Sequence, residues 1–164
     1  MVTQVPREIP ETILVVEDDS AIFNRVKLIL EGAGFEVLSA GSANQARFIT
    51  EGFPRPIHLL LSDVMMPDVS GPESAKALKQ DRPDMRVMLM SGFADGAMLV
   101  LNHGWHFIAK PFLASTLLAR ANDVLCSAVR EQGTDHFDTR HSADHEALWH
   151  RRNLFAESVF RKRG

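Results

Sequence analysis

The sequence predicts an α/β fold in which five parallel strands form one sheet with helices on both faces. Five apolar segments of four to six residues, rich in Val, Ile, Leu and Met, are spaced along residues 12–109. Segments this short suit buried strands, and the stretches between them show the apolar spacing of helices. Strands that alternate with helices form parallel sheets whose strands are buried on both sides.

Composition narrows the class of protein further. The chain has 164 residues, 45% of them hydrophobic and 24% charged, which suits one globular domain with a tail. It has no apolar run long enough to cross a membrane, and its first residues lack the apolar stretch of a signal peptide. A single cysteine forms no internal disulfide. We therefore expect a cytoplasmic protein without membrane contact.

Each expected strand is an apolar run bounded by turn-forming residues. The first is rich in β-branched residues, which favour extended backbone. The third is followed by the turn sequence Met66-Pro67-Asp68, and the fourth ends at Ser91-Gly92. In chain order the expected strands are 12–16, 35–40, 57–62, 87–90 and 106–109.

The helices are expected between these strands, after an extended lead-in over residues 1–11 that carries two prolines. Apolar residues follow helical spacing from Ser20 until two glycines stop the first helix. Ser42 suits the N-cap of the second helix, and Pro72 suits the first turn of the third. The expected helices are 20 to about 32, 43 to about 52, 72–80, 95–102 and 114–129.

Charged and polar residues stand where four of these strands end. The first strand is followed by Glu17-Asp18-Asp19, the third by Asp63, the fourth by Ser91 and the fifth by Lys110. The carboxyl ends of parallel strands meet at one edge, where ligands of such sheets bind. We expect these side chains to converge there, except Asp19, which suits a helix cap.

This combination of carboxylates, hydroxyl and ammonium points to phosphoryl chemistry. Neighbouring carboxylates repel one another, and Mg²⁺ relieves that repulsion while it keeps water ligands. A carboxylate beside the ion can attack phosphorus, because the metal neutralises charge on the transferring group. The ammonium and hydroxyl are then donors to the phosphoryl oxygens. The pattern predicts an aspartyl-phosphate site.

Four motifs in this order, ILVVEDD, SDVMMPDVSG, MSGFADG and FIAKPF, resemble the receiver domain of two-component response regulators. The resemblance covers about residues 12–129 and implies a doubly wound, flavodoxin-like sheet of five strands. It also implies that Asp63 accepts phosphate from a histidine kinase or a histidine phosphotransfer protein. Asp18 and Asp63 would bind Mg²⁺, Glu17 would reach it directly or through water, and Met65 would contribute its backbone carbonyl.

The same resemblance assigns the remaining site residues. Lys110 would contact the phosphoryl group, and Ser91 would turn toward it on activation. Phe107 holds the place of the aromatic switch residue, although it could equally be an ordinary core aromatic, and Ser91 could be a strand-end cap. Pro111 matches a proline that is often preceded by a cis peptide bond in this family.

Met65 also separates the sequence from a second family with an aspartate nucleophile. Phosphatases of the haloacid-dehalogenase type place another Asp two positions after the nucleophile, as general acid–base, and methionine cannot move a proton. We therefore expect that the chain is not a dedicated phosphatase and not an enzyme in the usual sense. The chain would promote its own phosphorylation and a slow dephosphorylation by metal-positioned water.

Two features depart from the family pattern. The 19 residues from Ser91 to Lys110 are roughly one helical turn fewer than is typical, so the helix at 95–102 should be shortened. The apolar residues of this helix could form a patch that binds a partner on the 94–129 face. Residues 130–140 resemble a linker, and residues 144–163 could form an amphipathic helix that packs back, pairs with a second copy or docks a partner.

Three functions are consistent with these sequence features. The first is a stand-alone response regulator that signals by contact with an effector or as a homodimer, through the 94–129 face or the C-terminal helix. The second is a phosphorelay shuttle or sink, since MSGFADG also resembles receivers of hybrid kinases. The third, a transcriptional regulator, is disfavoured because residues 129–164 carry a net charge of only +1 and are too few for a DNA-binding domain.

Overall fold

The computed structural model describes residues 9–92 and 104–131. The predicted helix at 95–102 and the predicted tail helix lie outside these residues. The described strands are β1 (Thr12–Val16), β2 (Glu36–Ala40), β3 (Leu59–Asp63), β4 (Arg86–Ser91) and β5 (His106–Ala109). The described helices are α1 (Ser20–Gly32), α2 (Ala43–Gly52), α3 (Gly71–Asp81) and α5 (Ala114–Glu131).

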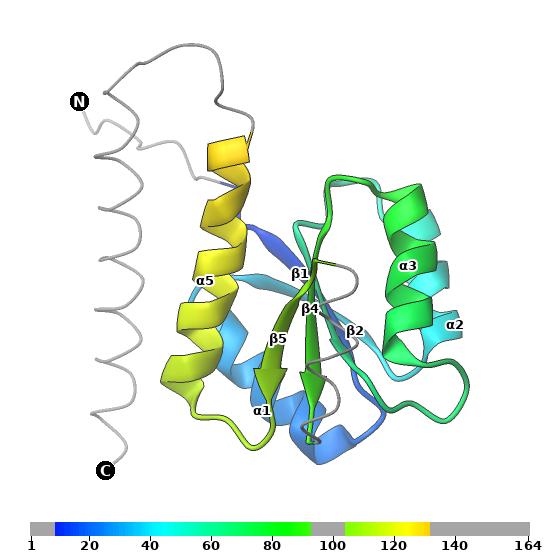
Figure 1. Cartoon of the computed structure of the whole chain (residues 1–164), viewed down its shortest axis with the longest axis horizontal. Coiled ribbons are helices and arrows are strands. Elements are labelled where there is room, and N and C mark those ends of the chain that lie inside the picture. The colour runs from blue at the N-terminus through cyan, green and yellow to red at the C-terminus, as the bar shows by residue number, and fades with distance from the viewer. Residues whose placement is uncertain (1–8, 93–103, 132–164) are drawn as a thin grey trace, which may run out of the picture.

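The strands form one parallel sheet in the order β2-β1-β3-β4-β5, which confirms the predicted fold class. Figure 1 shows α1 and α5 on one face of the sheet and α2 and α3 on the other. The register places Asp63 beside Met90 and Ser91 beside Ala109, so the carboxyl ends of neighbouring strands lie at one edge. Among the described helices, none has the length and hydropathy needed to cross a bilayer.

Two apolar layers hold this sandwich together. Successive strand residues point to opposite faces, so Ile13 packs into the layer under α1 and α5 while Leu14 packs into the layer under α2 and α3. All five residues of β1 are buried, as expected for a central parallel strand. The sheet edge that carries the polar residues is therefore supported by packed side chains on both faces.

Some element bounds differ from the prediction, and the hydrogen bonds explain two of them. The second strand begins one residue later because the amide of Phe35 donates to the carbonyl of Leu30, at the end of α1. The prediction of strand 57–62 was wrong at both ends, since β3 runs over Leu59–Asp63. The imidazole of His58 accepts from the amide of Thr12 at 2.9 Å, and the register of β3 with β1 begins with the next pair, Ile13 and Leu59. Helix α5 runs two residues past the predicted end.

Candidate functional site

Three carboxylates meet at the carboxyl edge of the sheet. One oxygen each from Glu17, Asp18 and Asp63 lies within 4.8 Å of the others. Glu17 follows β1 and is 3% exposed, Asp63 ends β3 and is 8% exposed, and Asp18 is exposed to solvent. Oxygen ligands in this number and spacing suit a hard divalent cation. The structure thus brings together the three acidic residues that the sequence placed at one edge.

Lys110 joins this acidic cluster from the end of β5. Its ammonium Nζ lies 2.7 Å from Oε2 of Glu17 and 3.0 Å from Oδ2 of Asp63. Its backbone amide donates to the carbonyl of Ser91 at 2.8 Å, which fixes the start of its side chain beside β4. One ammonium against three carboxylates leaves an excess of negative charge at the site.

Burial and ion pairing shift the pKa values of Glu17 and Lys110. Burial raises the pKa of the Glu17 carboxyl, against the hydrogen bonds from Lys110 and from the amide of Asp19. Burial also acts to lower the pKa of the Lys110 ammonium, but its hydrogen bonds to Glu17 and Asp63 outweigh it and the pKa is raised. Lys110 is therefore a protonated donor and not a base.

The segment after Asp63 is shaped by backbone contacts. The amide of Met65 donates to Oδ1 of Asp63 at 3.2 Å, and the amide of Gly71 donates to the carbonyl of Val64 at 3.0 Å. A Cβ atom on Gly71 would overlap the carbonyl oxygen of Asp63. Glycine is required here because α3 begins against the backbone that carries Asp63.

The remaining predicted site residues occupy the same edge. Ser91 is buried at the end of β4, and its register places it on the same face of the sheet as Phe107. Phe107 is half-buried and packs against the apolar layer under α2 and α3. The side chain of Met65 is 65% exposed beside Asp63. The peptide bond between Lys110 and Pro111 is cis, as the resemblance implied.

Asp19 has the structural role predicted for it. Its carboxylate accepts from the amides of Ala21 and Ile22, at 2.8 and 3.0 Å, and caps α1. Sequence reasoning missed Gly71, because Ser70-Gly71-Pro72 contains a cap and a helix-starting proline and gives no sign of a close approach to Asp63. It also gave no reason to expect that Lys110 would contact two carboxylates at once.

Comparison with known proteins bears on this site. Residues 13–122 match the family model described as the response regulator receiver domain. The chain is similar to the sensor kinase CckA of Brucella abortus, with 30% identity over 70% of this chain and 12% of the kinase. It is also similar to the phosphate regulon transcriptional regulatory protein PhoB of Pseudomonas aeruginosa, with 35% identity over 70% of this chain and 52% of that protein. The chain therefore spans about half, or less, of these relatives.

Two solved structures resemble this fold over nearly their whole length. A CheY-like receiver domain protein from Methanospirillum hungatei superposes with a TM-score of 0.68 and 31% identity, over 75% of this chain and 99% of that one. The receiver domain of the hybrid histidine kinase CckA superposes with a TM-score of 0.61 and 33% identity, over 70% of this chain and 98% of that one.

Proposed function

The chain belongs to the response regulator receiver domain family, and on that premise we propose that Asp63 is its phosphoacceptor. Receiver domains of this family are phosphoacceptor signalling domains of two-component systems, not classical enzymes, and interact with histidine kinases or phosphotransfer proteins. One observation carries the assignment to Asp63. This carboxylate ends a central strand, contacts an ammonium at 3.0 Å and lies within 4.8 Å of two further carboxylates.

Glu17, Asp18 and Asp63 would hold Mg²⁺, with the backbone carbonyl of Met65 as a further ligand. The fit rests on the donor set, since three carboxylate oxygens lie together and one ammonium leaves two negative charges unmatched. When bound, Mg²⁺ would neutralise charge on the transferring phosphoryl group.

The chain's own residues then supply the chemistry. A carboxylate oxygen of Asp63 attacks the phosphorus of a phosphohistidine on the partner, so that an O–P bond forms, the N–P bond breaks and the partner's imidazole leaves. Lys110 needs little movement to donate to the phosphoryl oxygens, because its ammonium already lies 3.0 Å from Asp63. Hydrolysis of the product is slow, because Met65 offers no group that transfers a proton to or from water.

Signalling would pass from Asp63 to the neighbouring strands. Ser91 and Phe107 share a face of the sheet, so a Ser91 hydroxyl drawn toward phosphate opens space that Phe107 can enter. Phe107 also lines a groove of about 370 Å³ with Pro111, Thr116 and Arg120. A partner protein or a second copy that contacts this part of the 94–129 face would detect the change.

The test is phosphorylation by acetyl phosphate, followed by phosphate-affinity electrophoresis with and without Mg²⁺. Wild type should give a Mg²⁺-dependent shifted band, and Asp63→Ala should give none. Asp19→Ala is the matched control, because Asp19 is a neighbouring carboxylate that caps α1 and should leave the shift in place. A shifted band in Asp63→Ala would overturn the assignment.

A phosphorelay shuttle or sink is the second candidate. It is favoured by the similarity to the receiver domain of the hybrid histidine kinase CckA. The phosphorylated chain, freed of acetyl phosphate, would be incubated with a histidine phosphotransfer protein. Rapid transfer of the phosphoryl group to that protein would support a shuttle, whereas retention on Asp63 would favour a response regulator that signals by contact.

A further inference from the structure

We propose that Asp68 is a positioning residue, which ties the β3–α3 loop (residues 64–70) to the N-terminus of α2 and thereby holds Met65 and Asp63 in place. The proposal rests on the function proposed above for Asp63. Asp68 is not part of the acidic cluster formed by Glu17, Asp18 and Asp63. It acts through the loop that leads away from Asp63.

The contact joins parts of the chain that are distant in sequence. Oδ2 of Asp68 accepts from the amide of Ala43 at 3.1 Å, across 25 residues of sequence. Backbone amides, first that of Val69 and then those of Asp68 itself, Asn44 and Ala43, lower the pKa of its carboxyl and outweigh the opposing effect of burial. The ionised carboxylate therefore holds both its own loop and the first turn of α2.

Helix α2 has two separate acceptors at this end, and only one of them comes from the loop. The first amides of a helix have no partner within the helix. Ser42, the N-cap, accepts from the amide of Gln45 at 3.2 Å, and Asp68 accepts from the amide of Ala43. A negative charge at a helix N-terminus is also favoured by the helix dipole.

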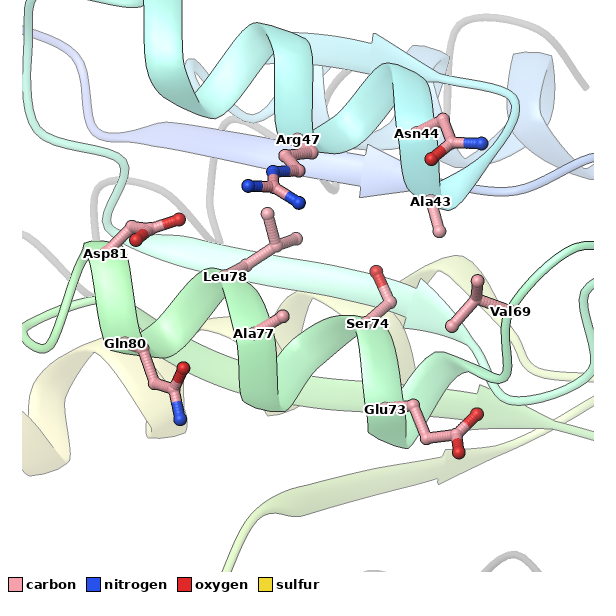
Figure 2. Close-up of a pocket in the computed structure, with 10 residues that line it drawn as sticks. All are labelled: Ala43, Asn44, Arg47, Val69, Glu73, Ser74, Ala77, Leu78, Gln80 and Asp81. Carbon is pink, nitrogen blue, oxygen red and sulfur yellow. The ribbon is translucent and has the colours of Figure 1, made fainter.

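The loop is thus anchored at two points. At its end, Gly71 lies against the backbone of Asp63, and its amide donates to the carbonyl of Val64. In its middle, Asp68 is bound to α2, and Figure 2 shows the next residue, Val69, beside Ala43 at one end of the groove between α2 and α3. Met65 lies between Val64, whose carbonyl is bound by Gly71, and Asp68.

Anchoring matters because the segment between the two points is mostly exposed. Met65, Pro67 and Asp68 are exposed to solvent, and of residues 65–68 only Met66 packs partly against the apolar layer under α2 and α3. A loop that samples several conformations presents the Met65 carbonyl and the Asp63 carboxylate together for only part of the time. The apparent affinity for Mg²⁺ falls in proportion to that fraction.

The test compares Asp68→Ala with Ser42→Ala in the full chain. Both variants remove one acceptor from the N-terminus of α2, but only Asp68→Ala releases the loop. The measurements are the thermal midpoint, the Mg²⁺ dissociation constant by titration calorimetry, and hydrogen exchange of the amides in residues 64–70. Removal of a group that orients metal ligands typically weakens metal binding by about tenfold or more.

We expect both variants to lower the thermal midpoint by a similar amount. Asp68→Ala should also weaken Mg²⁺ binding by about tenfold and speed exchange in the loop, while Ser42→Ala changes Mg²⁺ affinity by less than about twofold. Asp68→Asn keeps an acceptor oxygen and should give intermediate values.

Unchanged loop exchange or unchanged Mg²⁺ affinity in Asp68→Ala would make Asp68 a simple helix cap and overturn the proposal. A wild-type chain that binds no Mg²⁺ would instead contradict the proposed function. In that case loop exchange in Asp68→Ala still decides whether the tether exists, because that measurement needs no metal.

Discussion

Charged side chains lie at both ends of the sheet, but the balance of positive and negative charge differs between the two ends. At the amino end, the guanidinium of Arg82 donates to the main-chain carbonyl of Thr50, in the last turn of α2, and to that of Arg55, three residues after α2 ends. Glu36 accepts from the hydroxyl of Thr12 and is paired with Arg55. The charges of Arg82, Arg55 and Glu36 therefore each have a partner within the chain, either an opposite charge or a backbone carbonyl.

At the carboxyl end the charges do not balance. Glu17, Asp18 and Asp63 lie within 4.8 Å of one another, and Lys110 alone opposes them. The buried position of Glu17 raises its pKa, which is the mark of a carboxylate placed where its charge is unfavourable. The two ends therefore differ in their charge balance: the charges of the amino end are paired within the chain, whereas the carboxyl end carries an excess of negative charge, which the Mg²⁺ proposed above would neutralise.

Paired glycine substitutions test this comparison with the largest expected effect. Gly71→Ala places a methyl group on the carbonyl oxygen of Asp63, and overpacking of this kind costs about 3 kcal/mol. Gly52→Ala, at the amino end of the sheet, meets nothing within 4 Å and should stabilise by about 0.5 kcal/mol. Urea unfolding measures both, and phosphorylation by acetyl phosphate should be lost only in Gly71→Ala. Equal stability of the two variants would contradict the close approach described at Gly71.

Removal of one cation from each end should have a smaller effect. Lys110→Met removes the ammonium that pairs with two buried carboxylates and should cost about 2 kcal/mol in chelator at neutral pH. Arg55→Met breaks a pair whose arginine side chain is 44% exposed, and should cost less than about 1 kcal/mol. Mg²⁺ should restore most of the stability of Lys110→Met, since it replaces the lost positive charge, and should not affect Arg55→Met. Failure of Mg²⁺ to restore it would count against a cation site.

The smallest expected effect is a difference in how stability depends on pH. Because the pKa of Glu17 is raised in the folded state, stability should fall as pH rises from the ordinary pKa of a glutamate through that raised value. The pKa of Glu36 is lowered, first by its hydrogen bond from Thr12 and then by Arg55, so its contribution is lost as pH falls through the lowered value.

Glu17→Gln and Glu36→Gln should therefore change the pH profile in opposite directions. In chelator, Glu17→Gln should lose less stability than wild type on the rising side, and Glu36→Gln should lose less on the falling side. Thermal unfolding over a pH series measures both. Profiles that shift in the same direction would show that the two ends do not differ in the way described.

Much of this protein could be predicted from local sequence patterns. Apolar runs such as 12–16 and 106–109 identified strands, because an apolar segment of four or five residues suits a strand and is too short for a typical helix. Parallel order then placed Glu17, Asp63 and Lys110 at one edge, and Ser42 and Asp19 were identified as caps from their position before apolar helices. The strand bounds at residues 35 and 57 were wrong, because the first depends on the hydrogen bond of Phe35 to the end of α1 and the second on the contact of His58 with Thr12, 46 residues away.

The sequence by itself determined which residues reach the site, and the tertiary structure decided how they are held there. Lys110 lies 93 residues from Glu17 and 47 from Asp63, and no local pattern shows that one ammonium contacts both. The apolar pattern of the sequence likewise does not show that Asp68 caps α2 or that Gly71 lies against Asp63. Periodicity reports which face of an element is buried, whereas contacts between elements depend on their distances after packing, and a distance is a property of the folded chain alone.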